Sequence, residues 1–211
     1  MRLTTATVGP LTTASTTAIV ATTGGSTAAG TAFTLTTSPY VMDHPRRVLI
    51  TSAGTDTSVI FSIVGTDWNG TNVSELLTGG SSGSPVYSVY DYSTIISITP
   101  TVNATASTNA VGTNGIATTR PIFLDEYAFS QVSLQVSVTG TVSATVRQSL
   151  QDPTRVGYTN VAWLNHPDSN LVNLTGNVQG NYAYMPKIVQ LVLNSGSGSA
   201  ELAVIQAAME P

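Results

Sequence analysis

Short runs of β-branched and aliphatic residues that alternate with Ser and Thr recur along most of this 211-residue chain. Gly, Asn, Asp and Pro bound these runs, as turns between strands require. Helical periodicity, with apolar residues three and four positions apart, is nearly absent. The pattern therefore predicts an all-β protein with two β-sandwich-like parts, of jelly-roll or Ig-like type, and an extended N-terminal arm.

The clearest block of strands lies in the first half of the chain. The expected strands there are residues 47–52, 58–64, 71–78, 86–91 and 93–99. Asn69-Gly70 lies between the second and third of them and favours a type I′ turn, in which both central residues have a positive φ. The Gly-rich stretch 79–84 is predicted to be a flexible linker.

Two hairpins in the second half of the chain have similar sequences. The first is expected to join strands 132–138 and 142–150 through Gly140, and the second to join strands 188–193 and 200–206 through residues 195–198. In each, a strand rich in Val and Leu meets a small Gly-containing turn. Two such hairpins can face each other as the layers of a sandwich. Residues 158–184, between them, are expected to be irregular, with a short helix at most.

These patterns divide the chain into three parts. Residues 1–39 are rich in Thr and Ala, are broken at Gly24-Gly25 and carry few large apolar side chains, which predicts an N-terminal arm or edge strands. A first hairpin of the domain is the alternative for this segment. Residues 40–119 are predicted to form a first β-domain, ending in a long loop over 101–119, and residues 120–211 a second β-sandwich domain.

The composition excludes several classes of partner. Charged residues are only 9% of the chain, with 7 Lys and Arg against 11 Asp and Glu and a net charge of -4, so nucleic acid is not an expected partner. Cysteine is absent, which excludes disulfides and cysteine-bound metals. No apolar run reaches the roughly 18 residues of a spanning helix, and the N-terminus lacks a signal-peptide pattern. A soluble protein with no membrane partner is expected.

The two histidines stand in similar local sequences, Asp43-His44-Pro45 and Asn165-His166-Pro167-Asp168. An imidazole beside a carboxylate suits base catalysis or metal binding. Adjacent residues of an extended segment point to opposite faces, however, so Asp43 is badly placed to orient His44. A following proline also marks the entry to a turn. Both histidines are therefore predicted to be structural turn residues.

No other group of residues indicates a catalytic, cofactor-binding or metal site. The adjacent carboxylates Asp125-Glu126 do not place two acids across one cleft, and residues 79–83 lack the Lys of a phosphate loop. The tyrosines permit two interpretations, exposed rows that bind sugars or proteins, or half-buried cross-strand residues that cap a core. They are Tyr87, Tyr90, Tyr92, Tyr182 and Tyr184. The sequence predicts a protein that is not an enzyme and needs no cofactor.

Two stretches of the chain resemble known virion proteins. The segments Pro45-Arg-Arg-Val-Leu-Ile-Thr51, Val59-Ile-Phe-Ser-Ile-Val-Gly-Thr-Asp67 with Asn69-Gly70, and Val73-Ser-Glu75 are similar to the first β-domain of small tailed-bacteriophage virion proteins. Residues 142–153, with Trp163, His166-Pro-Asp168, Pro186 and 188–206, resemble a widespread module of phage structural proteins. These are patterns of strands and turns, and they carry no catalytic signature.

The resemblance implies a virion structural protein, similar to capsid decoration or cement proteins, which are β-rich oligomers at capsomer junctions. The expected partners are other virion proteins, above all the major capsid protein, and further copies of the chain, with a trimer as one form. At 211 residues the chain is larger than the compact decorators. This difference leaves a neck, collar, tail or fibre-base position open. The rivals from other classes are an extracellular carbohydrate-binding or adhesin module and a hydrolase.

Overall fold

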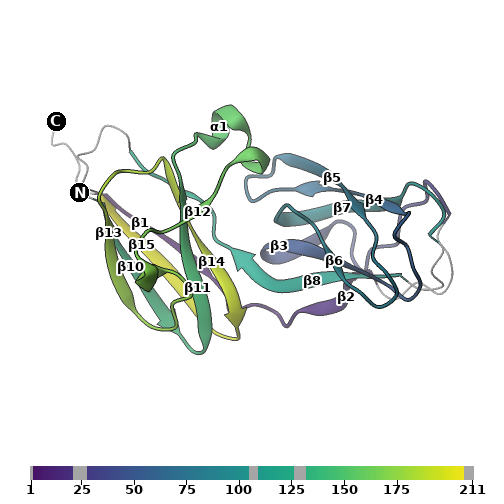
Figure 1. Cartoon of the computed structure of the whole chain (residues 1–211), viewed down its shortest axis with the longest axis horizontal. Coiled ribbons are helices and arrows are strands. Elements are labelled where there is room, and N and C mark those ends of the chain that lie inside the picture. Colours follow the sequence, from purple (N-terminus) through teal and green to yellow (C-terminus); the bar gives the residue numbers. More distant parts are fainter. Residues whose placement is uncertain (1, 21–27, 105–108, 126–131, 207–211) are drawn as a thin grey trace. The chain divides into compact units, whose positions relative to one another are not determined.

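The computed structural model describes residues 2–20, 28–104, 109–125 and 132–206. It is mostly β, with 55% strand and one short helix, and its strands form two antiparallel sheets (Figure 1). The all-β prediction is therefore confirmed. The chain divides into two compact units, unit 1 (residues 1–11 and 116–211) and unit 2 (residues 12–115).

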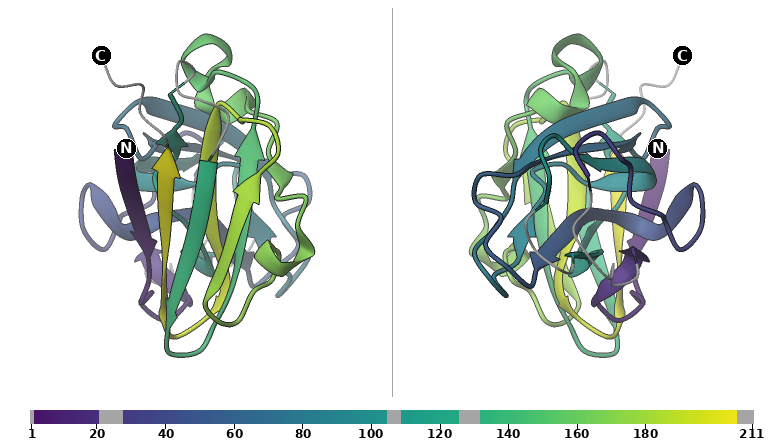
Figure 2. Two further views of the ribbon diagram at one scale, coloured as in Figure 1. Left: turned by 90° about the vertical axis from the view of Figure 1, so that its left-hand side faces the viewer. Right: turned by 90° about the vertical axis from the view of Figure 1, so that its right-hand side faces the viewer.

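Unit 1 contains a four-stranded sheet built from both ends of the chain. Its order is β1 (Arg2–Val8), β15 (Ser199–Gln206), β10 (Val132–Thr139) and β13 (Val178–Tyr182). β1 lies at one edge beside β15, as the left view of Figure 2 shows in purple and yellow. Val8 of β1 is fully buried in the unit 1 core. The first residues of the chain are thus an integral edge strand.

The remaining elements of unit 1 are two long strands, which complete the same core, and shorter elements around them. They are β11 (Val142–Ser149), β14 (Ile188–Gly196), β12 (Leu164–Asn165), β9 (Ile122–Phe123), the end of β8 (Asn109–Thr118), helix α1 (Pro153–Val156) and the 3-10 turns η1 (Tyr158–Asn160) and η2 (Ser169–Leu171). Helix α1 begins where the Asp152 carboxylate accepts the backbone N–H of Thr154, with Pro153 in the first turn.

The two hairpins predicted for unit 1 do not form. β10 pairs with β15, and β11 pairs with β14, so each expected hairpin places its two strands in different sheets. The two Gly-containing turns lie together, since the N–H groups of Ser197 and Gly198 both donate to the carbonyl of Thr141 at 3.0 Å. Alternate residues of all four strands then meet in one core, which includes Val136, Val146, Leu191 and Leu202.

Unit 2 is a sheet whose central order is β3 (Tyr40–Ser52), β7 (Tyr92–Pro100), β4 (Ile60–Thr66) and β5 (Asn72–Thr78). β6 (Val86–Tyr87) pairs with β3, and β2 (Ser15–Val20) pairs with β8. The core contains Ile19 and Phe33 from the predicted arm together with Phe61, Ile63 and Ile98. Residues of the 1–39 segment thus contribute to the cores of both units, and the units divide near residues 11 and 115 rather than 39 and 119. Gly24-Gly25 lies outside the described residues.

Residues 109–118 form strand β8, where the sequence predicted a loop. Val111, Thr113 and Ala117 are buried there. The small residues have a steric cause, because a Cβ on Gly112 would lie 1.7 Å from the carbonyl oxygen of Ser15. Because β2 lies this close, β8 has no room for a large side chain at this point. Large β-branched and aromatic side chains are the signal by which a strand is predicted from sequence.

Two other local predictions are corrected in unit 2. Of Asn69 and Gly70, Gly70 alone has a positive φ, so the turn is not type I′. The Asp67 carboxylate accepts the N–H groups of Asn69 and Thr71 at 2.8 and 2.9 Å, which favours a turn that begins at Asp67. The 79–84 stretch is not a free linker, because Gly79 and Gly83 donate to the carbonyls of Val59 and Ser52.

Candidate interaction surface

One face of the unit 2 sheet is open to solvent, and on strands β7, β4 and β5 it carries no charged side chain. The register places these residues side by side on strands β3, β7, β4 and β5, opposite the core-facing set. We call the set the open face: Val41, Ile60, Ser62, Val64, Thr66, Asn72, Ser74, Leu76, Thr78, Thr94, Ile96, Ser97 and Thr99. All of them are aliphatic, hydroxyl or amide side chains.

Four large aliphatic side chains of the open face are exposed. They are Val41, Ile60, Leu76 and Ile96, with exposed fractions from 37% for Ile60 to 70% for Leu76. The solvated face of an antiparallel sheet is ordinarily polar, and exposed apolar groups on one surface mark contact sites. The open face therefore has the chemistry of a surface that a partner covers.

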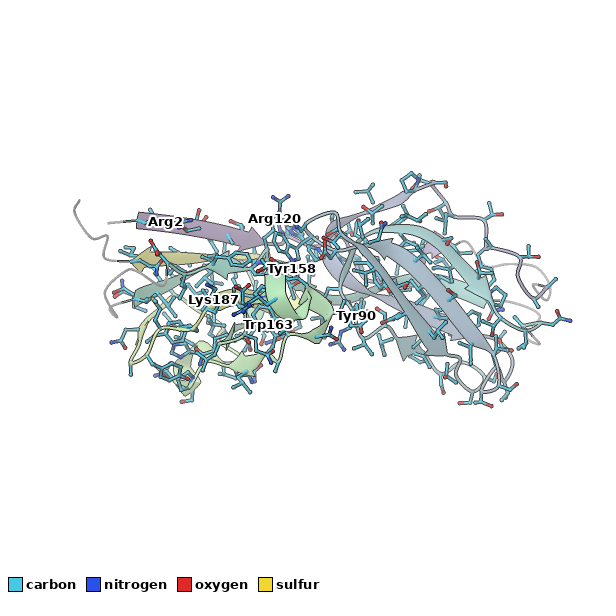
Figure 3. All side chains as sticks on the ribbon, turned by 90° about the horizontal axis from the view of Figure 1, so that it is seen from above. Arg2, Tyr90, Arg120, Tyr158, Trp163 and Lys187 are labelled. Atoms are coloured by element: carbon cyan, nitrogen blue, oxygen red, sulfur yellow. The ribbon has the colours of Figure 1, made fainter. Side chains whose placement is uncertain are left out.

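A shallow groove of about 460 Å³ lies along β5 at the border of the open face. Its lining residues are Ser62, Ser74, Glu75, Leu76, Val89 and Tyr90. Leu76 and Val89 are both 70% exposed, so the groove combines apolar side chains with hydroxyl groups. Tyr90 is labelled in Figure 3. The hollow has room for side chains of a partner segment.

Glu75 fixes the loop that borders this groove. One carboxylate oxygen, Oε2, accepts the backbone N–H groups of Val89 and Tyr90 at 3.1 and 3.3 Å. The other, Oε1, is buried without a hydrogen-bond partner. Burial raises the pKa of Glu75, although the two N–H groups and the charge of Arg47 oppose the rise. Burial, and then the nearby charge of Glu75, also raise the pKa of Tyr92.

A buried ion pair was not foreseen from the sequence. Arg46 is fully buried, and its guanidinium donates to the Asp43 carboxylate, to the carbonyl of Thr12 at 3.0 Å and to the carbonyl of Asn114 at 3.4 Å. Burial alone would raise the pKa of Asp43, but the Thr12 N–H and the Arg46 charge hold it below its usual value. Strand alternation could have indicated the buried arginine from the sequence, because it directs one of Arg46 and Arg47 toward the core.

The two histidines differ in their surroundings, and only His166 is near a turn. His166 follows β12, is buried, and packs against Tyr182 with ring centroids 4.5 Å apart and ring planes tilted by 47°. Its Nδ1 accepts the N–H of Asp168 at 3.0 Å, and burial lowers its pKa. His44 lies within β3, so the predicted turn is wrong there; the irregularity takes the form of a register shift between Val41 and Arg46.

The tyrosine rows are divided between core and surface. Tyr92 and Tyr182 are buried, whereas Tyr87 and Tyr184 are about half exposed. The hydroxyl of Tyr184 accepts a hydrogen bond from the amide of Gln148 at 2.8 Å. The alternation that places two tyrosines on one face thus does not produce an exposed row at either position.

Of the acidic pair Asp125-Glu126, Asp125 is described and Glu126 lies outside the described residues. Among the residues that the structure describes, no group of three or more His, Asp or Glu side chains is arranged to hold a metal ion. Trp163, which Figure 3 labels, lies under the guanidinium of Arg147, 4.6 Å from the ring centroid. This cation–π contact fixes the segment before β12.

Comparison with known proteins gives no assignment: no family model matches the chain, and no curated protein matches it. In the described part of the chain, no helix has the length and apolar character needed to cross a membrane.

Proposed function

We propose that this chain is a non-enzymatic structural protein of a tailed-bacteriophage virion, and that it acts as a capsid decoration or cement protein. In this proposal the open face of unit 2 lies against a neighbouring virion protein, with the major capsid protein as the partner. The proposal combines the resemblance of the strand and turn motifs with one structural observation, the uncharged and partly aliphatic open face.

The chemistry of the open face favours a permanent contact. Covering a charged surface costs desolvation energy at every ion, whereas Ser and Thr hydroxyls and aliphatic groups are covered at much smaller cost. Charged residues are correspondingly depleted in the buried centres of protein interfaces. A broad, shallow surface of this kind suits attachment to a flat shell more than capture of a small ligand, which needs a concave site.

We also propose that each unit is a β-sandwich-like domain, of jelly-roll or Ig-like type. The two separate apolar clusters, one in each unit, support this description. A neck, collar, tail or fibre-base position would use the same surface with a different neighbour, so it is an outcome that a particle experiment distinguishes.

The experiment adds full-length recombinant chain to particles made without it, and measures bound copies and the temperature at which the particles release DNA. Leu76→Glu places a charge on the open face, and Leu164→Glu places one on an exposed leucine of unit 1; the two side chains are 70% and 65% exposed. We expect wild type and Leu164→Glu to bind and raise the release temperature, and Leu76→Glu to bind at least about tenfold more weakly. Equal binding of both variants would show that the open face is not the surface that contacts the particle. Failure of the wild type to bind any particle would refute the proposed function.

A further inference from the structure

No described strand pairs with the outer edge of β1 in the four-stranded sheet of unit 1. β1 pairs with β15 over all residues from Arg2 to Val8, in one continuous register. It is the terminal strand of that sheet, and no described strand pairs with its other side. Figure 3 shows Arg2 at the start of this strand. In an antiparallel strand, every second residue directs its N–H and C=O away from the existing partner.

Residues 3–8 of this edge lack the usual protection against a new strand. Residues 3–8 contain no charge and no proline, and their pairing with β15 has no bulge. Leu3, on the outer side, is exposed. The outer strand of unit 2 differs, because Glu75 of β5 holds the backbone of Val89 and Tyr90 against it. An edge that is regular, uncharged and uncovered by described residues is a template for strand addition.

We infer that the occupant of this edge is a second copy of the same strand, paired antiparallel about a two-fold axis at Thr5. In that register Thr5 lies opposite the partner's Thr5, and Thr4 lies opposite the partner's Ala6. Leu3 lies opposite the partner's Thr7, and Arg2 opposite the partner's Val8. The inference concerns the isolated chain and does not depend on the proposed virion function.

The sequence of β1 is self-complementary in this register. The pairs keep core-facing residues with core-facing residues, since Val8 and Ala6 lie toward the unit 1 core and Leu3, Thr5 and Thr7 lie away from it. Opposed threonines are favourable cross-strand pairs, and no two like charges meet. A two-fold interface uses the same surface on both copies, so every open backbone group of one strand finds its equivalent on the other.

The predicted association is weak in solution and concentration-dependent. A single pair of short edge strands buries less surface than the roughly 1,200–2,000 Å² of stable complexes. Dimers of this type become effective when other contacts already hold the two copies near one another.

The test is sedimentation velocity of the full-length chain over a range of concentrations, with charges placed at the two-fold axis. Thr5→Lys and Thr5→Glu each place two like charges opposite one another at the two-fold axis. The Thr5 side chain is exposed and points outward, so either change leaves the monomer fold intact. Each variant alone is expected to dimerise at least about tenfold more weakly than the wild type. An equimolar mixture of the two variants is expected to recover the dimer as a species with one copy of each.

Gln179→Lys is the matched control, because it adds the same charge to an exposed outer position on β13, the opposite edge of the sheet. It is expected to dimerise like the wild type, and thermal melts establish that all variants are folded. The inference is overturned by a wild type that stays monomeric up to about millimolar concentration, by a dimer that Thr5→Lys leaves unchanged, or by mixed variants that fail to recombine.

Discussion

The buried guanidinium of Arg46 joins three segments of unit 2, around Thr12, Asp43 and Asn114. Replacing it by an apolar side chain of similar length removes the guanidinium donor, and its charge, from the Asp43 carboxylate and from the carbonyls of Thr12 and Asn114. Breaking a buried ion pair from one side costs about 3–5 kcal/mol. We therefore expect Arg46→Met to lower the free energy of unfolding by about 3 kcal/mol in urea denaturation followed by circular dichroism.

Arg47→Met is the control for this prediction. The neighbouring Arg47 side chain is 45% exposed, and its ion pair with Asp91 is long, at 3.9 Å. Exposed pairs of this kind contribute less than about 1 kcal/mol. If the two methionine variants were equally stable, the Arg46 cluster would have no special structural role.

The buried carboxyl of Glu75 predicts a pH dependence of stability. Its pKa is raised in the folded protein, so ionisation of Glu75 opposes folding at neutral pH. This cost disappears as the pH falls through the raised pKa toward the unfolded value. We expect Glu75→Gln to melt at a higher temperature than the wild type at pH 7, because the amide oxygen can still accept from Val89 or Tyr90. The difference is expected to vanish near pH 4, and a variant less stable than the wild type at pH 7 would contradict this assignment.

At the level of elements, the sequence predicted most strands but not their partners. Alternation located β10, β11, β14 and β15 within a few residues, because period-two patterning is a local property. The small Gly turns suggested hairpins, yet those turns join strands of different sheets. Which strand pairs with which depends on contacts between distant residues, and turn composition does not record them.

The open face could not be predicted from the sequence, because it too depends on which strands pair. Val41, Ile60, Leu76 and Ile96 come from four strands, and only their register brings them onto one face. Strand β8 was missed because close contact with β2 requires small residues, which read as a loop. Local sequence predicted a turn at each histidine, and this prediction is wrong for His44, which lies within β3.

Pairing of β1 with β15 changes the prediction for the N-terminal segment. The sequence suggested an N-terminal arm or edge strands for residues 1–39. Residues 2–8 form an edge strand, so their deletion removes Val8 from the unit 1 core and exposes the edge of β15. We expect the deletion to increase amide hydrogen exchange in β15 and β10 by at least about tenfold, with exchange in β4 and β7 unchanged. Unchanged amide hydrogen exchange in β15 would show instead that residues 2–8 are not an integral strand of the unit 1 sheet.

For the whole molecule, the scarcity of charge is the property that most favours assembly. A chain with 9% charged residues has little electrostatic repulsion to keep copies and partners apart. Long Thr- and Ser-rich strands also leave backbone edges and uncharged faces available to neighbours. These properties are unfavourable for a protein that must stay monomeric, and they are useful in one that is fixed permanently in a shell.

The most direct test of the virion proposal is a cryo-electron microscopy map of the intact particle of the phage that, under the proposal, encodes this chain. We expect density for the chain on the capsid, with Leu76, Ile96 and Val41 of the open face covered by a neighbouring virion protein. A particle that lacks the chain, or a bound chain whose open face is turned to solvent, would contradict the proposal.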